Sequence, residues 1–322
     1  MKLRFNWHLK SKRGAEGKTP SRRMLRLLGQ SWAASPLRRF IQVAFFVLFL
    51  VLFLYVTWPY TASPVETAEG VWPSHYADNF TGKEFVPAES FLMLDPLVGL
   101  SSTLATMTWT PAMTWCAVVL AICLFIPRFF CGYICPFGTL IDFFDWLFWR
   151  HIPWKLKKVG PVVGAKYGLL AFVLVTAVFG VMTAGYLAAI PVFTRGFAFI
   201  VSPLELGLFR SWHQIPAYDV AQYVSIGLFV AILCLGVLTP RFWCRYLCPS
   251  GAVFSLVNMV RLTDRKVKTG CVACSRCVYN CPFDAIEPAD FSTRLDCTYC
   301  QTCGGICPVQ AIEFTVRGAD PN

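Results

Sequence analysis

The sequence predicts an α-helical membrane protein that carries a small, polar, cysteine-rich domain at its C-terminal end. Hydrophobic residues make up 56% of the 322 residues and charged residues only 15%, against roughly 45–50% and about 25% in soluble domains. The mean hydropathy is +0.54. There are 15 cysteines, and twelve of them stand in C-x2-C or C-x3-C spacings. This composition excludes an ordinary soluble enzyme and a disordered chain.

Long uncharged runs predict four transmembrane helices. We expect them at 40–58, 111–127, 162–184 and 220–240. The uncharged run over 96–127 is too long for a single span. We therefore expect Pro111 to divide it into a half-helix near 96–108 and the second span.

Charge predicts the orientation of the chain. Residues 1–39 hold eleven Lys and Arg and one acid, whereas residues 59–95 hold six acids and one base. Because basic segments stay inside, both termini are expected in the cytoplasm and the acidic segment on the periplasmic side. This asymmetry accounts for the net charge of +11, so no nucleic-acid partner is expected.

The membrane part contains an internal repeat. Residues 126–142 match residues 239–255 at eight of seventeen positions, with an offset of 113. Upstream, 95–100 resembles 202–207, so each unit is expected to contain a span, a periplasmic half-helix, a second span and a C-x3-C-P turn. Units that run in the same direction are related by an axis along the membrane normal. This axis would bring the two C-x3-C-P turns together at the cytoplasmic face.

Three interpretations of these turns stay open. Their cysteines are Cys131, Cys135, Cys244 and Cys248. Together they could hold a further metal centre, act as dithiol pairs, or serve a structural role in turns that open helices. The nearby Arg128, Arg241 and Arg245 could offset thiolate charge, but as interface residues whose charged ends reach water they need no special role.

The C-terminal segment holds a second repeat, with a period of 26 residues. The run C-x2-C-x2-C-x3-C-P occurs twice, which is the bacterial-type ferredoxin pattern for two [4Fe–4S] clusters. Because the fourth cysteine of each run serves the other cluster, the sets are crossed. The first set is Cys271, Cys274, Cys277 and Cys307, and the second is Cys297, Cys300, Cys303 and Cys281. Zinc is the alternative, but its sites usually consist of two C-x2-C pairs.

The chain therefore divides into a basic cytoplasmic arm (1–39), a four-helix membrane domain (40–262) and a cytoplasmic α+β 2[4Fe–4S] ferredoxin domain (263–322). None of the four histidines lies in an expected span, which argues against a membrane haem held by two histidines. No C-x-x-C-H or G-x-G-x-x-G occurs. The remaining cysteines are expected to be small buried hydrophobic residues; they are Cys116, Cys123 and Cys234.

Two carboxylates occupy matching places in the two repeats and are candidates for proton transfer. They are Asp95 and Glu205. Asp95 precedes Pro96, so a helix-capping role is equally compatible with the pattern. No other catalytic residue is identified.

Together, the four spans, the CGYICP and CRYLCP turns, the Asp95-Pro96-Leu97 segment and the double cluster motif resemble the NapH-type membrane quinol dehydrogenases and the broader NapH/NosR-like polyferredoxins. The resemblance covers about 40–320. It implies an oxidoreductase component in the bacterial inner membrane that carries electrons between the quinone pool and a redox partner. The expected direction is quinol oxidation that feeds an extracytoplasmic reductase. An iron–sulfur protein or a multihaem cytochrome is the expected partner, and membrane lipid surrounds the helices.

A second class of function is also compatible with the sequence. The chain could be a membrane-anchored polyferredoxin that relays electrons, or an assembly factor for metal centres, without a quinone site of its own. The paired repeats argue against a simple anchor, because one span would suffice. No flavin-attachment motif of the kind expected in NosR-like members is visible.

Overall fold

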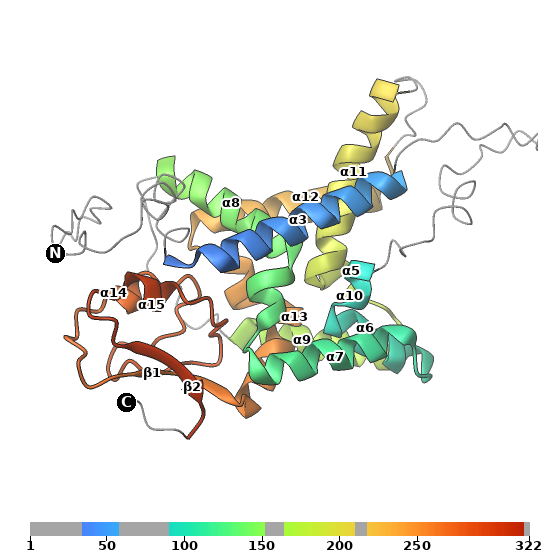
Figure 1. The fold of residues 1–322 in the computed structure, drawn as a ribbon. Helices are drawn as coiled ribbons and strands as arrows, with labels where there is room; N and C mark the ends of the chain where they lie inside the picture. Colours follow the sequence, from blue (N-terminus) through green and yellow to red (C-terminus); the bar gives the residue numbers. More distant parts are fainter. Residues whose placement is uncertain (1–33, 58–89, 152–163, 210–217, 319–322) are drawn as a thin grey trace, which may run out of the picture.

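The computed structural model describes residues 34–57, 90–151, 164–209 and 218–318. A bundle of helices joins, at one end, a small part that contains two strands and two short helices (Figure 1). The basic arm before residue 34, the acidic segment over 58–89, His8, His75 and His213 lie outside the described residues.

The first repeat begins with α3 (Pro36–Thr57), followed by α5 (Ser90–Met93), α6 (Pro96–Thr106) and α7 (Pro111–Phe125). It ends in a π-helical turn, η1 (Phe130–Ile134), and α8 (Pro136–His151). Proline at the first helical position starts α6 and α7, since its fixed φ suits the helix and its missing N–H is not needed there. The break expected near Pro111 is present, and left-handed Met107 ends α6.

The second repeat contains α9 (Ala165–Val178), α10 (Ala184–Leu187), α11 (Ala189–Phe209), α12 (Val220–Cys234) and the short η4 (Leu235–Val237). The π-helical turn η5 (Trp243–Leu247), α13 (Pro249–Val257) and η6 (Asn258–Val260) complete it. The expected half-helix beginning near Pro203 is wrong, because Pro203 lies inside the continuous helix α11. Proline frees the carbonyl four residues earlier, and the Tyr218 hydroxyl donates to that carbonyl, on Phe199, at 2.7 Å.

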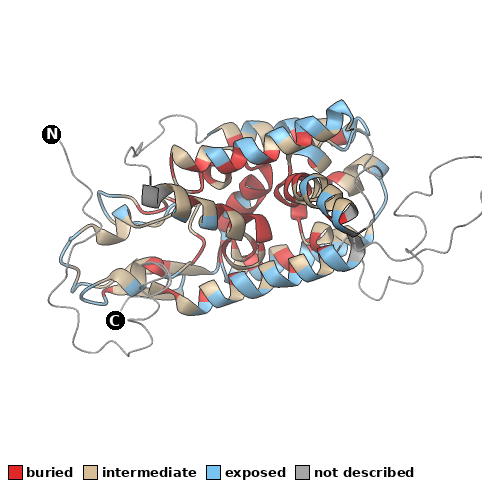
Figure 2. Ribbon diagram, turned by 90° about the horizontal axis from the view of Figure 1, so that it is seen from above, coloured by how far each residue is buried: buried red, intermediate tan, exposed pale blue. Residues whose placement is uncertain are grey.

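The two repeats interleave. Helices α3, α8, α11 and α12 pack together on one side, and α6, α7, α9 and α13 pack on the other (Figure 1). Aromatic rings of both repeats pack together in the first group, with ring centroids 4.7 Å apart for the tilted pair Phe49 and Phe193 and 5.9 Å apart for the stacked pair Phe137 and Phe229. Figure 2 shows the buried residues gathered in the middle of the bundle, while the outer helix faces are exposed.

Two described helices are long and apolar enough to cross a membrane, by length and composition. They are the stretches Pro36–Tyr55 and Val220–Val237. Pro111–Phe125 and Ala165–Val178 are apolar but shorter. The four-span layout therefore stays a prediction.

The C-terminal part contains β1 (Thr263–Val267), α14 (Arg276–Tyr279), α15 (Thr302–Ile306) and β2 (Ile312–Val316). The strands are antiparallel, with Thr263 opposite Val316 and Arg265 opposite Phe314. Because β1 and β2 pair, the chain between them forms a closed loop, and the two cysteine runs within that loop pack against each other through α14 and α15.

Candidate functional site

The structure brings together each crossed set of tail cysteines. One cavity is lined by Cys271, Cys274, Cys277 and Cys307, and a second is lined by Cys281, Cys297, Cys300 and Cys303. Each cavity thus takes three cysteines from one run and the last cysteine from the other. Four thiols around one cavity are the donor set that a [4Fe–4S] cluster uses.

The backbone of each run is wound to surround its cavity. Left-handed residues recur at the same places in both runs, with φ near 50° at Ala273, Ser275, Tyr299 and Gln301. Turns of this kind make the backbone N–H groups converge, which suits an anionic group. The last cysteine of each run also accepts a backbone N–H at 3.3 Å, from Ala285 to Cys281 Sγ and from Ala311 to Cys307 Sγ.

Single-ion geometry is not found at these cysteines. Among the described residues, no group of three or more His, Cys, Asp or Glu is spaced to hold one metal ion. A zinc site would need four donors converging on a single ion.

The two C-x3-C-P turns have the same local structure. In each, a π-helical turn carries the first cysteine, and the second cysteine stands immediately before the proline that starts α8 or α13. Gly138 N–H donates to Cys135 Sγ at 3.4 Å, and Gly251 N–H donates to Cys248 Sγ at 3.3 Å. A sulfur at a helix N-terminus faces the positive end of the helix dipole, which stabilises a thiolate.

The four thiols of these turns lie close enough to influence one another. Burial raises the pKa of Cys131 to about 11 and that of Cys244 to about 12. Burial also raises the pKa of Cys135 and of Cys248, and charge on Cys131 and Cys244 raises both further. The two turns therefore lie near one another, while the axis expected to relate the repeats stays a prediction.

Two arginines cross between the repeats, which corrects the expectation that they reach water. Arg128 and Arg241 are 1% and 0% exposed. Arg128 Nη2 donates to the Gly251 carbonyl at 2.8 Å, and Arg241 Nη2 donates to the Gly138 carbonyl at 3.3 Å. Each arginine has a left-handed backbone, with φ of 50° and 53°. Each side chain thus holds the helix start beside the other repeat's second cysteine.

Each crossing arginine meets a carboxylate, but the two carboxylates come from different parts of the chain. Arg241 pairs with Asp142 of α8, which also pairs with Arg38 and Arg39 at the start of α3. Arg128 pairs with Asp296 of the ferredoxin part at 3.0 Å. Position 255 of α13, the counterpart of Asp142, is a serine, and its hydroxyl donates to Asp296 at 2.9 Å. The ferredoxin part therefore supplies the carboxylate that the second repeat lacks.

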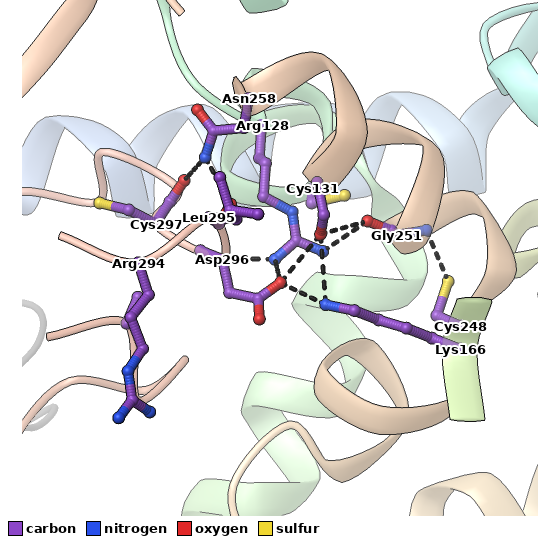
Figure 3. A network of polar contacts seen from close by, with 12 residues as sticks. Arg128, Cys131, Lys166, Cys248, Gly251, Asn258, Arg294, Leu295, Asp296 and Cys297 are labelled. Carbon is purple, nitrogen blue, oxygen red and sulfur yellow. Dashed lines mark hydrogen bonds and ion pairs between the residues drawn. The ribbon is translucent and has the colours of Figure 1, made fainter. Parts of the chain in front are cut away.

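Asp296 is the centre of this second network (Figure 3). The guanidinium of Arg128 and the fully buried ammonium of Lys166 on α9 converge on its carboxylate, next to the Cys131 and Cys248 side chains. Burial acts to raise the pKa of Asp296, but Arg128 and Lys166 overcome it and hold the pKa below its usual range. Asp296 is therefore ionised at neutral pH.

The second tail cavity is the one that adjoins the C-x3-C-P turns. Tyr133 donates its hydroxyl to the Tyr299 carbonyl at 2.7 Å. A Cβ on Gly132 would lie 3.1 Å from the Thr298 carbonyl oxygen, a tight contact that would push the loop away slightly, so glycine favours this close approach. Asn258 donates to the Cys297 carbonyl at 3.3 Å. These contacts join the membrane domain to the loop over 297–299, which carries part of the second cysteine set.

A further contact joins the turn before α13 to the ferredoxin part. Arg245, which also was expected to reach water, is 8% exposed and pairs with Asp284 at 3.1 Å. The Phe283 ring lies under the crossing guanidinium of Arg241, 4.6 Å from its central carbon. The ferredoxin part thus contacts both repeats.

Asp95 and Glu205 do not occupy matching places. Asp95 is fully buried and caps α6, accepting the Leu97 N–H at 3.1 Å and the Ser250 hydroxyl at 3.0 Å. Glu205 is a buried residue in the last turns of α11. The pattern at Asp95 is that of a helix cap, which accounts for its burial without proton transfer.

The unpaired cysteines of the helices divide into two groups. Cys116 and Cys123 of α7 are buried, whereas Cys234 at the end of α12 is exposed, which differs from the expected burial. The histidine that falls in a described helix, His151, ends α8.

Comparison with known proteins locates a family signal at the repeats. A family model described as a 4Fe-4S binding domain matches the chain twice, over 108–156 and 221–269. Each match contains one C-x3-C-P turn, and both end before the first tail cysteine. The two matched segments thus contain Arg128 and Arg241 as well as the glycine carbonyls to which these arginines donate.

Several known proteins are similar to this chain. YccM of Escherichia coli is 27% identical over 60% of this chain and 53% of its own length. The ferredoxin-type protein NapH of Haemophilus influenzae is 22% identical over 66% of this chain and 67% of NapH. The regulatory protein NosR of Pseudomonas aeruginosa is 27% identical over 49% of this chain and 21% of NosR. The chain is thus similar to ferredoxin-type proteins of the NapH and NosR kind.

The extent of these matches differs among relatives. The chain spans about half the length of YccM and about a fifth of NosR. No solved structure matches the chain. The matched segments are described as 4Fe-4S binding, and YccM is named as a putative electron transport protein.

Proposed function

We propose that this protein is an iron–sulfur electron-transfer component of the bacterial inner membrane that connects the quinone pool to a redox partner protein. Bound clusters supply one-electron transfer. The observation that carries the proposal is the docking of the ferredoxin part against both C-x3-C-P turns, through Tyr133 and Gly132 of the first turn and Arg245 of the second. A polyferredoxin that merely needed an anchor would not require such a contact.

The proposal includes a third iron–sulfur centre at Cys131, Cys135, Cys244 and Cys248. The ion pairs around these turns use six cations and three carboxylates, which leaves positive charge in excess; the cations are Arg38, Arg39, Arg128, Lys166, Arg241 and Arg245. Buried positive charge is costly unless an anion compensates it. Four thiolates holding a cluster would supply that anion. The description of the family model that covers both turns supports the same assignment.

The two tail sites have different places in this scheme. The loop that holds the second set contacts the membrane domain. In the first set, Cys274 is exposed. Exposure at the first set leaves it open to a soluble or membrane-bound redox partner. We propose an iron–sulfur protein or a cytochrome as that partner.

We further propose that α3, α7, α9 and α12 span the membrane with both termini in the cytoplasm. The excess of Lys and Arg in residues 1–39 supports this orientation. A reporter enzyme fused after Asp78 should be active in the periplasm, and one fused at the C-terminus should be active in the cytoplasm. A periplasmic C-terminus would contradict this arrangement.

Quinol-linked reduction is the direct test of the function. Full-length protein in liposomes is given a reduced quinone analogue under anaerobic conditions, and reduction of the iron–sulfur signals is followed by EPR. We expect reduction in the wild type and its loss in Cys135→Ser, with Cys234→Ser as the matched control, because Cys234 is exposed and lines neither tail cavity.

Two results would contradict parts of this proposal. If dithionite reduces the clusters but quinol does not, the protein is a relay or assembly factor without its own quinone site. If quinol reduces the tail clusters normally in Cys135→Ser, the C-x3-C-P turns carry no electrons.

A further inference from the structure

A buried arginine lies between the two tail cavities. Arg265, in the middle of β1, is 3% exposed and lines both cavities. Among the described residues that line the two cavities, Arg276 is the one other charged residue, and it lines the first cavity alone. Arg265 therefore occupies the wall that the two cysteine sets share.

The hydrogen bonds of Arg265 are incomplete. Its Nη1 donates to the Phe291 carbonyl at 2.8 Å, but Nε and Nη2 are buried and have no hydrogen-bond partner among the described residues. An arginine side chain offers five N–H donors, and a buried donor without an acceptor is costly. An acceptor is therefore expected at the positions that these nitrogens face.

No carboxylate compensates the charge of Arg265 within the described part of the chain. The neighbouring Asp264 carboxylate pairs with Arg261 at 2.9 Å instead. One cysteine of each set lies near the Arg265 guanidinium. Cys277 lines the first cavity together with Arg265, and Cys303 lines the second cavity together with it.

We propose that Arg265 is a bridging residue that donates N–H hydrogen bonds to sulfur atoms at both tail cluster sites and raises both reduction potentials. This inference rests on the proposed function, since it requires that both tail clusters form. Each cluster gains one electron on reduction and becomes more negative. A buried positive charge and hydrogen bonds to the sulfurs stabilise that reduced form.

Because Arg265 lines both cavities, its replacement should affect the reduction potentials of both tail clusters. Removing its charge should lower both tail midpoints, because one guanidinium borders both cavities. Arg276 offers the matched comparison, since it lines the first cavity alone. Arg294 offers the neutral control, because its side chain is 44% exposed and pairs with Glu287.

The test is a potentiometric EPR titration of the anaerobic full-length protein with dithionite as the reductant. In Arg265→Gln we expect the equilibrium constant for one-electron reduction to fall at least tenfold at both tail clusters, a shift of about 59 mV each. Arg276→Gln should shift one cluster only, and Arg294→Gln neither. Unmoved midpoints, or a shift at a single cluster, in Arg265→Gln with full iron content would overturn the proposal.

A second measurement covers the case in which Arg265→Gln does not take up iron. The wild type and Arg265→Lys are prepared with ¹⁵N in the arginine guanidinium groups and compared by pulsed EPR of the reduced clusters. We expect a ¹⁵N coupling in the wild type that Arg265→Lys loses. An identical coupling pattern in both proteins, or none in the wild type, would overturn the role of Arg265. Absence of both tail clusters from the wild type would instead overturn the proposed function as well.

Discussion

At the residue scale, the exchange of the fourth cysteine ties the two halves of the ferredoxin part together. Cys281 lines the cavity of the second run, and Cys307 lines that of the first. Each of these sulfurs accepts a backbone N–H four residues further along the chain. Each cavity therefore takes its fourth cysteine from the other run, so the two runs must fold together to complete either site.

The exchange predicts which cluster each cysteine variant loses. Cys281→Ser should remove the cluster of the second run and leave that of the first, while Cys307→Ser should do the reverse. EPR of the dithionite-reduced variants measures this, with Cys116→Ser as a control that keeps both signals. Loss of the first-run cluster in Cys281→Ser would show that the sets are not crossed.

The sequence predicted these cysteines but missed the charged residues that connect the sites. Regular spacing and a following proline identify each cysteine run, because cluster ligation needs that local pattern. Arg128 and Arg241 follow a proline at the same place in both repeats, a signal that was present but was taken for an interface role. Asp296 gave no signal, since its partners Arg128 and Lys166 are 168 and 130 residues away.

At the scale of elements, the helix starts and the docking loop depend on one another. The start of α13 is held by Arg128, and Arg128 is in turn held by Asp296 of the ferredoxin part. By contrast, the start of α8 is held by Arg241 and Asp142 within the membrane domain. The second repeat is thus completed only when the ferredoxin part is docked.

This dependence predicts the effect of removing Asp296. Asp296→Ala leaves Arg128 and Lys166 buried without their carboxylate, and breaking a buried ion pair costs about 3–5 kcal/mol. The undocked population of the ferredoxin part should rise at least about a hundredfold. Limited proteolysis near 258–262 in detergent measures it, with Glu287→Ala as the control for an exposed pair. Equal cleavage rates in the two variants would contradict the coupling.

Helix boundaries could be predicted from the sequence where a proline determines them. They could not be predicted where a contact with a distant residue determines them. Pro96 and Pro111 start helices as expected, because proline suits the first helical position. The same residue type at 203 gave a wrong half-helix, since the Tyr218 hydroxyl satisfies the carbonyl that proline frees. That contact comes from a segment beyond α11, so a local pattern could not indicate it.

At the scale of the whole molecule, three groups of cysteines are linked one to the next: the paired C-x3-C-P turns, the second tail set and the first tail set. Docking contacts join the first two, and Arg265 stands between the last two. The two ends of this row face different surroundings, one within the helical domain and the other at the exposed Cys274. Such an arrangement suits a protein that passes electrons between a membrane carrier and a partner.

The central claim is that the C-x3-C-P turns form an iron–sulfur centre beside the two tail clusters. Iron and acid-labile sulfide are measured in the anaerobically purified full-length protein and in Cys135→Ser and Cys248→Ser. Because each [4Fe–4S] cluster holds four irons, we predict about twelve irons per chain in the wild type and about eight in each variant. About eight irons in the wild type, unchanged in both variants, would contradict the account.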